Sequence, residues 1–185
     1  AGWLPPVRLR PQQNMPCDIR SARVDFTPSE NARVGHYVET VTATLSGLES
    51  ELNALDAKVG DGDTGSTFAA GAREIARLLH QQQLPLAQLD TLCALIGERL
   101  TVVMGGSSGV LMSIFFTAAG QAVHDGKSLP EALLRGLHQM KHYGGADLGD
   151  RTLIDALQPA LEALRDCGLD AAASAAKAGA AKTAT

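Results

Sequence analysis

The 185-residue sequence has few of the residues that build disulfide-rich or β-rich proteins. It has only three cysteines, Cys17, Cys93 and Cys167, and their wide spacing matches neither a disulfide framework nor a zinc site. Aromatic residues make up 4% of the chain, and no β-branched runs recur between turn signals. Since alanine is abundant, the composition indicates an all-α fold. We predict that Cys93, in an apolar run, is buried as a small hydrophobic residue.

The sequence also lacks a surplus of positive charge and any long apolar run. It has 16 lysines and arginines against 20 aspartates and glutamates, which gives a formal charge of −4 at pH 7. No basic stripe could neutralise a phosphate backbone, so nucleic acid is excluded as a partner. Because neither a membrane-length apolar segment nor a signal-peptide pattern is visible, we expect no membrane span and a cytoplasmic location.

Two parts of the chain differ in composition. Residues 1–29 contain five of the eight prolines, together with scattered arginines and no helical period. Proline fixes φ and removes a backbone donor, so this part is predicted to be an extended linker. We expect the linker to follow a separate domain of a longer protein. Residues 30–185 are long enough to form one core.

Apolar residues recur at three- and four-residue intervals through most of residues 30–185, as in amphipathic helices. Short glycine-rich connections predict an up-and-down antiparallel helical barrel of about seven to eight helices. We expect Ser29 to cap the first helix, Pro159 to kink or shorten the sixth, and the fourth, apolar nearly all round, to be the most buried. The predicted helices cover about 30–56, 64–81, 86–104, 107–123, 130–143, 151–165 and 169 towards the C-terminus.

Three carboxylates share one glycine-rich turn between the first two predicted helices. Asp56, Asp61 and Asp63 lie within eight residues of one another. Close like charges raise the free energy of a site unless a cation neutralises them. Oxygen ligands without histidine or cysteine favour Mg²⁺ or Ca²⁺ over zinc. The alternative is a solvated turn whose acids only cap the next helix.

Two other acidic motifs do not fit this turn. An EF-hand loop that starts at Asp61 requires an oxygen ligand at its fifth position and a glutamate at its twelfth, where the sequence has Gly65 and Ala72. A haloacid-dehalogenase-like Asp-x-Asp motif follows a β-strand, whereas residues 51–58 continue a helical pattern. The turn is therefore predicted to bind a divalent cation in another way.

Two more glycine-rich loops are expected at the same end of the bundle, because they follow the third and fifth helices. Residues 105–109 (Gly-Gly-Ser-Ser-Gly) open a helix, where free amides, small residues and two hydroxyls suit a phosphate. The alternative is that these glycines serve only a tight turn. Residues 144–152 again place glycines and a hydroxyl before a helix. Since no Walker A lysine is present, the three loops predict a polyphosphate held by metal and backbone.

Taken in order, these segments resemble the nucleotide-binding, C-terminal domain of ATP-dependent dihydroxyacetone kinases. The resemblance rests on residues 55–65, 105–109 and 149–157. It implies a barrel of eight antiparallel helices, with Asp56, Asp61 and Asp63 chelating two Mg²⁺ ions that hold the phosphates of ATP or ADP. The nucleotide-binding residues that it implies are Thr64, Gly65, Ser66, Thr67, Gly106, Ser107, Ser108, Leu111, Gly145, Thr152 and Leu153.

The resemblance also implies an activity and partners. Such a dihydroxyacetone (glycerone) kinase transfers the γ-phosphoryl group of Mg-ATP to dihydroxyacetone, which binds through a histidine of a separate domain. That domain belongs to the same chain or to a homodimer partner, and the full-length protein is expected to be a homo-oligomer. Because nothing in this sequence matches the histidine site, we expect the domain to bind ATP and to lack the acceptor. Beyond the metal ligands, it is expected to contain no catalytic residue.

Two other interpretations stay open from the sequence. One is a phosphotransferase-linked subunit that keeps ADP as a phosphoryl carrier, although such subunits usually have histidine where this chain has Thr64. The other is a fatty-acid-kinase-like module with a lipid inside the barrel. The resembling family also continues beyond the position of Thr185 into a last helix and a basic loop that covers the nucleotide. If nothing follows Thr185, the barrel is open on one side. We therefore expect either that further residues complete the barrel or that a partner does so.

Overall fold

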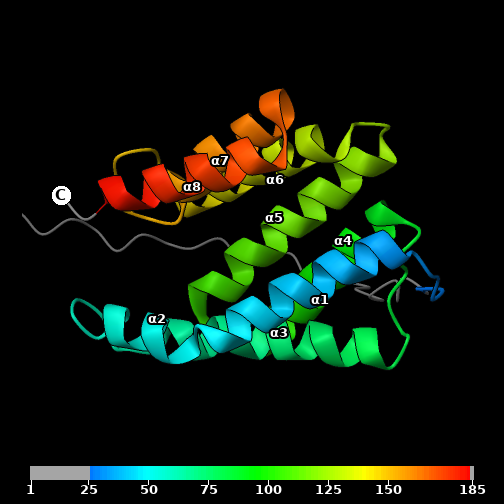
Figure 1. The fold of residues 1–185 in the computed structure, drawn as a ribbon, viewed down its shortest axis with the longest axis horizontal. Helices are drawn as coiled ribbons and strands as arrows, with labels where there is room; N and C mark the ends of the chain where they lie inside the picture. The colour runs from blue at the N-terminus through cyan, green and yellow to red at the C-terminus, as the bar shows by residue number, and fades with distance from the viewer. Residues whose placement is uncertain (1–25, 184–185) are drawn as a thin grey trace, which may run out of the picture.

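A computed structural model describes residues 26–183, and this part of the chain contains eight α-helices and no strand (Figure 1). Successive helices run up and down and pack on one another, and α1 and α2 both pack on α3. The predicted all-α, up-and-down helical fold is thus confirmed, whereas nearly all of the predicted linker lies outside the described residues. The helices are α1 (Ala32–Gly47), α2 (Glu49–Asp56), α3 (Thr64–His80), α4 (Leu89–Val103), α5 (Gly106–His124), α6 (Leu129–Gly144), α7 (Ile154–Cys167) and α8 (Leu169–Lys182).

The first predicted helix is in fact two helices, α1 and α2, which meet at Leu48. Leu48 leaves the helical conformation, with φ −88° and ψ 0°. A Ser46-Gly47 pair precedes it, and such pairs are common causes of helix kinks. In α1, Thr40 and Thr44 also donate their hydroxyls to carbonyls one turn earlier, which bends helices. The prediction of one unbroken helix to Asp56 is therefore wrong.

The start of α1 also differs from the prediction, because Asn31 and not Ser29 caps it. The Asn31 side chain accepts a hydrogen bond from the Val34 N–H at 3.2 Å. Ser29 instead forms an isolated parallel bridge with Pro85, and its hydroxyl donates to Gln88 at 2.7 Å. Since residues 84–88 serve this bridge, α4 begins at Leu89, three residues later than predicted.

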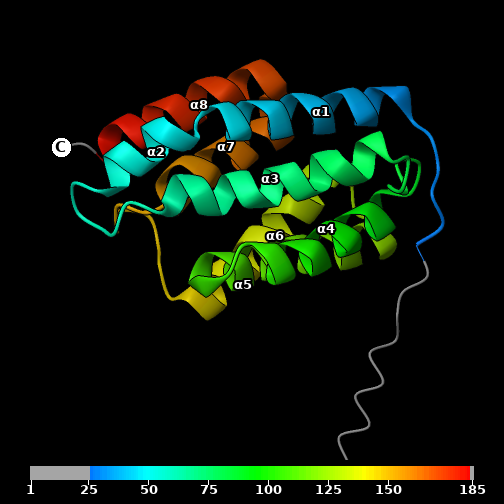
Figure 2. The same ribbon diagram turned by 90° about the horizontal axis from the view of Figure 1, so that it is seen from below.

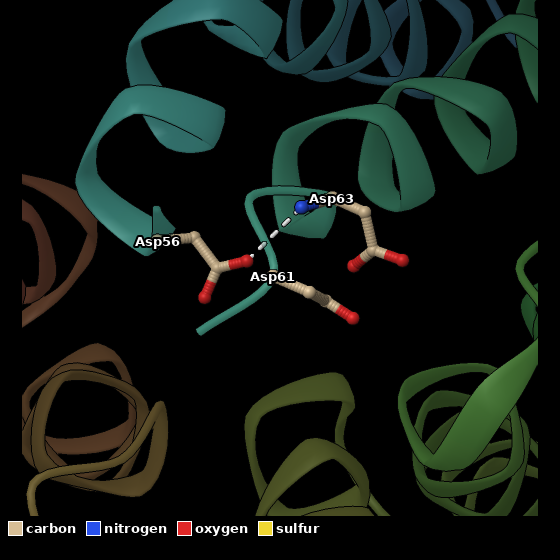
Figure 3. Close-up of side chains that lie close together, drawn as sticks. All are labelled: Asp56, Asp61 and Asp63. Carbon is tan, nitrogen blue, oxygen red and sulfur yellow. Dashed lines mark hydrogen bonds between the residues drawn. The ribbon is translucent and has the colours of Figure 1, made fainter. Parts of the chain in front are cut away.

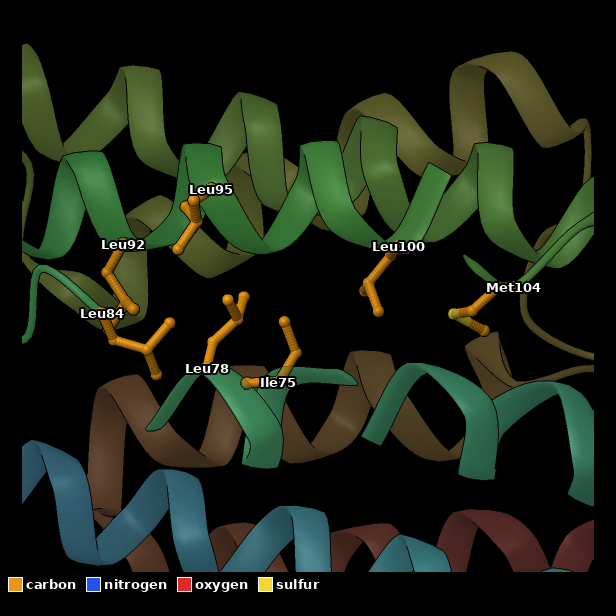
Figure 4. Close-up of a cluster of buried hydrophobic side chains, with 7 residues drawn as sticks. All are labelled: Ile75, Leu78, Leu84, Leu92, Leu95, Leu100 and Met104. Atoms are coloured by element: carbon orange, nitrogen blue, oxygen red, sulfur yellow. The ribbon is translucent and has the colours of Figure 1, made fainter. Parts of the chain in front are cut away.

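Two clusters of buried side chains form the core. Figure 4 shows the first cluster, which lies mainly between α3 and α4. The second joins α5, α6 and α7. Met112 and Phe116 of α5 pack against both clusters and so join them into one core. The first cluster contains Ile75, Leu78, Leu84, Leu92, Leu95, Leu100 and Met104, and the second contains Phe115, Leu137, Met140, Ile154 and Leu161.

The prediction that the apolar helix, α5, is the most buried is wrong. Its buried positions are mostly small residues, such as Gly109 and Gly120, which let the neighbouring helices approach. Its outward face forms a groove with α6, and Val110 is 53% exposed. By length and composition alone α5 could cross a membrane, but the core helices of other proteins pass the same test, and α5 packs along α4 and α6.

Pro159 lies inside α7 without ending it. Proline has no N–H, so the carbonyl of Asp155, four residues earlier, lacks its usual helical donor. On α8, Gly179 packs against this carbonyl, and a Cβ at Gly179 would overlap the carbonyl oxygen and lie 3.0 Å from the Ala156 Cα. The proline and the glycine together allow the closely packed α7–α8 pair.

Candidate metal centre

The loops that follow α2, α4 and α6 lie at the same end of the molecule. Figures 1 and 2, which differ by a 90° rotation, both place these three loops at the left. This agrees with the up-and-down arrangement, in which alternate connections share one end. The helices that border the second and third loops also pack together at this end, since a Cβ at Gly144, the last residue of α6, would lie 3.1 Å from the Leu111 side chain of α5.

The structure brings the three predicted metal ligands together at this end. Asp56 is the last residue of α2, and Asp61 and Asp63 lie on the loop that leads into α3 (Figure 3). One carboxylate oxygen from each residue lies within 4.8 Å of the other two. Asp61 and Asp63 are exposed and Asp56 is half-buried, so a cation could reach all three from solvent.

Asp56 organises the loop through backbone hydrogen bonds. Its Oδ2 accepts the N–H groups of Gly62 at 3.0 Å, Asp63 at 3.1 Å and Thr64 at 3.3 Å. These bonds, that of Thr64 above all, lower the pKa of Asp56, because they favour the charged carboxylate. Gly62 has φ +81°, a left-handed conformation that glycine adopts without strain. The loop therefore wraps around one carboxylate and turns the other two toward it.

The pKa of Asp63 shifts in the opposite direction to that of Asp56. The negative charge of Asp61 raises the pKa of Asp63, and burial and the charge of Asp56 add to the effect. Like charges at this distance disfavour ionisation, and a divalent cation would remove that repulsion. All donors are carboxylate oxygens, the set that Mg²⁺ and Ca²⁺ prefer. The residues present therefore fit such a cation.

The first turn of α3 contains four of the predicted nucleotide-binding residues. Thr64 and Thr67 are half-buried beside the acidic loop, and the Thr67 N–H donates to the Asp63 carbonyl at 2.9 Å. Gly65 is buried against α2. The Ser66 N–H and hydroxyl oxygen are both bonded to a side chain of α2. Contact of these four residues with a phosphate stays a prediction.

The second loop presents an open helix N-terminus. Gly105 and Gly106 have φ +61° and +57°, and a Cβ at either would meet nothing within 4 Å. No side chain caps α5, and the first amides of a helix have no intrahelical partner. Ser107 is exposed and Ser108 is half-buried. This geometry suits an anion, as the sequence predicted.

The third loop is held by Asp155, which the sequence analysis did not single out as a site residue. Asp155 accepts the N–H groups of Gly149 at 2.6 Å and Thr152 at 2.9 Å, and these bonds lower its pKa. Within the loop, Arg151 has φ +56°, an unusual conformation for a residue with a side chain. Because these residues form a capped turn, α7 begins at Ile154 and not at Arg151 as predicted.

The remaining predicted residues of the third loop face solvent. Gly145 ends α6 in the left-handed conformation, with φ +74°. Thr152 and Leu153 are exposed, and the Thr152 hydroxyl accepts the Ile154 N–H at 3.2 Å. A salt bridge of 2.6 Å between Lys141 and Asp147 closes the loop on the α6 side. The Thr-x-x-Asp spacing of Thr152 and Asp155, near the start of a predicted helix and after a glycine turn, is the signal that could have found Asp155.

Comparison with known proteins gives consistent matches. Residues 58–185 match the model of the DAK2 domain family, so Asp61 and Asp63 lie inside the matched segment and Asp56 lies just before it. A dihydroxyacetone kinase of Citrobacter freundii is 66% identical over 188 residues, 99% of this chain and 34% of that protein. The ADP-binding subunit DhaL of a PEP-dependent dihydroxyacetone kinase of Listeria innocua is 32% identical, over 74% of this chain and 66% of that protein.

A solved structure shares the fold. The crystal structure of the C. freundii dihydroxyacetone kinase in complex with AMP-PNP and Mg²⁺ matches with a TM-score of 0.89 at 66% sequence identity, over 99% of this chain and 34% of that chain. This chain thus spans about a third of the length of the C. freundii kinase.

Proposed function

Because this chain belongs to the DAK2 domain family, we propose that it is the nucleotide-binding part of an ATP-dependent dihydroxyacetone kinase. In this proposal the chain binds Mg-ATP, and the γ-phosphoryl group passes to dihydroxyacetone on a separate domain. The C. freundii relative is a kinase of that name, and the matching crystal structure contains AMP-PNP and Mg²⁺. In this proposal the acceptor site would belong to the part of the longer enzyme that this chain does not match.

The observation that carries the proposal is the meeting of Asp56, Asp61 and Asp63 within 4.8 Å at the end where the two other glycine-rich loops also lie. We propose that these three aspartates hold two Mg²⁺ ions. Three carboxylates offer six oxygens, and Mg²⁺ takes about six ligands, of which waters and substrate phosphates usually supply several. Two ions that share the triad would therefore need phosphate oxygens to complete their coordination.

The phosphates would be held by two kinds of group. The amides at the start of α5 supply hydrogen-bond donors and the positive end of a helix dipole. Small and hydroxyl residues allow close approach to the first turn of α3. Leu111, which packs against Gly144, would face the adenine or ribose together with the third loop. The proposed nucleotide contacts are Thr64, Gly65, Ser66, Thr67, Gly106, Ser107, Ser108, Leu111, Gly145, Thr152 and Leu153.

In such a site this chain's residues act by holding and orienting charge. Bound Mg²⁺ would neutralise the negative charge that spreads over the transferring phosphoryl group. Asp56 keeps the loop closed through three backbone bonds, and its lowered pKa keeps it ionised well below neutral pH. The open amides of α5 donate toward the phosphates without any rearrangement. No group of this chain is assigned as general acid or base.

Titration of the chain with AMP-PNP, followed by calorimetry, tests the proposal. We expect saturable binding with Mg²⁺ and a large loss of affinity when EDTA removes the metal. Folded protein that binds AMP-PNP equally well with and without Mg²⁺, or not at all, would refute the proposed metal-nucleotide site.

A second candidate is an ADP-carrying subunit, which the match to the Listeria DhaL subunit favours. A carrier retains ADP and exchanges it slowly, whereas an ATP-using kinase releases ADP after each turnover. Mass spectrometry of the denatured, purified protein distinguishes the two. Stoichiometric ADP would favour the carrier, and nucleotide-free protein favours the kinase.

The proposal also implies partners. A dihydroxyacetone-binding domain would supply the acceptor hydroxyl, either from the same chain or from a homodimer partner. The shared end of the three loops is the face that such a domain must approach. A homo-oligomeric, cytoplasmic kinase is the form that we propose for the full-length protein.

A further inference from the structure

Beside the triad, the side chain of Asn53 links α2 to α3 through two hydrogen bonds. Its Oδ1 accepts the Ser66 N–H at 3.0 Å, and its Nδ2 donates to the Ser66 hydroxyl oxygen at 2.9 Å. The two bonds use both ends of the amide, so they fix its orientation as well as its distance. Asn53 and Ser66 are both half-buried, which limits competition from water.

The two helices also approach unusually closely at this point. A Cβ at Gly65 would collide with the carbonyl oxygen of Glu49 and would lie 2.7 Å from the Asn53 Oδ1. About two turns further along α3, a salt bridge of 2.7 Å joins Arg73 to Glu49. Since the backbones are nearly in contact and two pairs of side chains hold them, the first turn of α3 has a fixed position on α2.

The metal ligands are attached to these same two turns. Asp56 follows Asn53 by three residues and so lies on the same side of α2, one turn later. Asp63 immediately precedes α3 and lies three residues before Ser66. The bond between Asp56 and the Thr64 N–H, at 3.3 Å, is therefore a second link across the α2–α3 joint, next to the Asn53–Ser66 pair. Both links bring Asp56 and Asp63 together against their mutual repulsion.

We propose that Asn53 is a positioning residue of the metal site, which acts by fixing Ser66 and with it the spacing of Asp56 and Asp63. This inference rests on the proposed function, because it assumes that the triad binds Mg²⁺ for a nucleotide. It also assigns Ser66 a role that the sequence did not suggest. The Ser66 amide and hydroxyl oxygen bond Asn53 across the α2–α3 contact, so Ser66 has this second role beside its proposed contact with the nucleotide.

Substitution of Asn53 by alanine tests the proposal, with Ser50→Ala as the matched control. Ser50 is an exposed, uncharged polar residue of the same helix. AMP-PNP binding is measured by calorimetry over a series of Mg²⁺ concentrations. For Asn53→Ala we expect the Mg²⁺ concentration of half-maximal binding to rise about 10- to 100-fold, the usual effect of losing an outer-shell partner of a metal site. Saturating Mg²⁺ should restore the wild-type affinity for AMP-PNP, and Ser50→Ala should change neither quantity.

A coupling measurement separates positioning from a general loss of structure. Ser66→Ala keeps the bond from the Ser66 N–H to Asn53 and deletes only the hydroxyl. Its Mg²⁺ requirement should therefore rise less than that of Asn53→Ala. The Asn53→Ala/Ser66→Ala double variant should require no more Mg²⁺ than Asn53→Ala alone, because the two side chains act as one pair. Circular dichroism and the thermal midpoint show whether each variant is folded, and the Ser66→Ala comparison stands even if Asn53→Ala unfolds.

The outcomes distinguish this inference from the proposed function. If the wild-type chain binds AMP-PNP without any Mg²⁺ dependence, the proposed function fails and this inference fails with it. If the wild type shows that dependence and both Asn53→Ala and Ser66→Ala keep the wild-type Mg²⁺ requirement, only the positioning role is refuted. The positioning role would also be refuted if Asn53→Ala bound AMP-PNP more weakly than the wild type even at saturating Mg²⁺. Such a loss would mean that the substitution acts on nucleotide contacts and not on metal binding.

Discussion

Substitution of Gly65 by alanine tests whether the site depends on the close approach of α2 and α3. Gly65 is buried in the first turn of α3. An added Cβ would collide with the carbonyl oxygen of Glu49 and would lie 2.7 Å from the Asn53 Oδ1 and 2.9 Å from the Asn53 backbone nitrogen. Two of these three atoms are backbone atoms, which cannot rotate away, so the helices must separate.

The expected magnitude follows from two opposing effects. Overpacking of a well-packed contact costs about 1–3 kcal/mol. Alanine in place of glycine favours a helix by about 1 kcal/mol in the interior and by less in the first turn. Because the collisions involve backbone, we expect a net loss of about 2 kcal/mol in the free energy of unfolding. For a chain of this size, that loss lowers the thermal midpoint by about 4–8 °C.

Thermal unfolding followed by circular dichroism measures this effect, and Gly47→Ala is the control. Gly47 also lies in a helix, but a Cβ there would meet nothing within 4 Å. The control should therefore keep or slightly raise the midpoint. Gly65→Ala should also weaken Mg²⁺-dependent AMP-PNP binding, since separation of the helices moves Asp63 away from Asp56. A Gly65→Ala variant as stable as Gly47→Ala, with unchanged binding, would refute the reasoning.

Three further predictions concern other parts of the fold. Hydrogen bonds from Arg77 and Arg99 lower the pKa of Glu74 from 4.5 to about 2. The charge of Glu74 therefore stabilises the fold fully above pH 4.5, and this stabilisation is lost as the pH falls through about 2. Glu74→Gln should thus be less stable than the wild type at neutral pH. As the pH is lowered from 4.5 to about 2, the difference between their free energies of unfolding should disappear. Asp155→Ala should speed hydrogen exchange at the Gly149 amide, and an unchanged rate would contradict the role of Asp155 in that loop. Burial raises the pKa of Cys93 to about 11, so a thiol reagent should label the exposed Cys167 in the native protein and leave Cys93 unlabelled until unfolding.

The sequence predicted the helices best where the apolar period and the turn chemistry agree. The bounds of α3 and α6 differ from the prediction by at most one residue at either end. For α6, Ser128 and Glu131 form a capping box and Gly145 ends the helix, so local signals mark both ends. The burial of Cys93 is also confirmed.

The failures come from a contact between distant parts of the chain at Ser29 and from a local break in the helix at Leu48. Ser29 is a good cap by residue type, yet its backbone pairs with Pro85, 56 residues further on. The break at Leu48 separates two halves of one continuous apolar pattern, which periodicity alone does not reveal. In both cases tertiary contacts and side-chain hydrogen bonds outweigh local propensity.

The candidate site was predictable to the extent that it is local. Asp56, Asp61 and Asp63 stand close in the sequence, and the crowding of three carboxylates on one glycine-rich turn indicated a cation. The residues that hold them in place were not predictable in the same way. Asn53 matters only because Ser66, 13 residues later, folds back onto it, and this pairing appears only in three dimensions.

Asp61→Asn tests the central claim most directly, because it removes one charge of the triad and keeps the size of the side chain. Asp61 is exposed and bonds none of the loop amides that Asp56 holds, so the fold should not depend on it. We predict helical circular dichroism close to that of the wild type, together with loss of Mg²⁺-dependent AMP-PNP binding and, in the full-length enzyme, of phosphoryl transfer. Retained binding with the wild-type Mg²⁺ requirement would contradict the claim that the triad is the metal site.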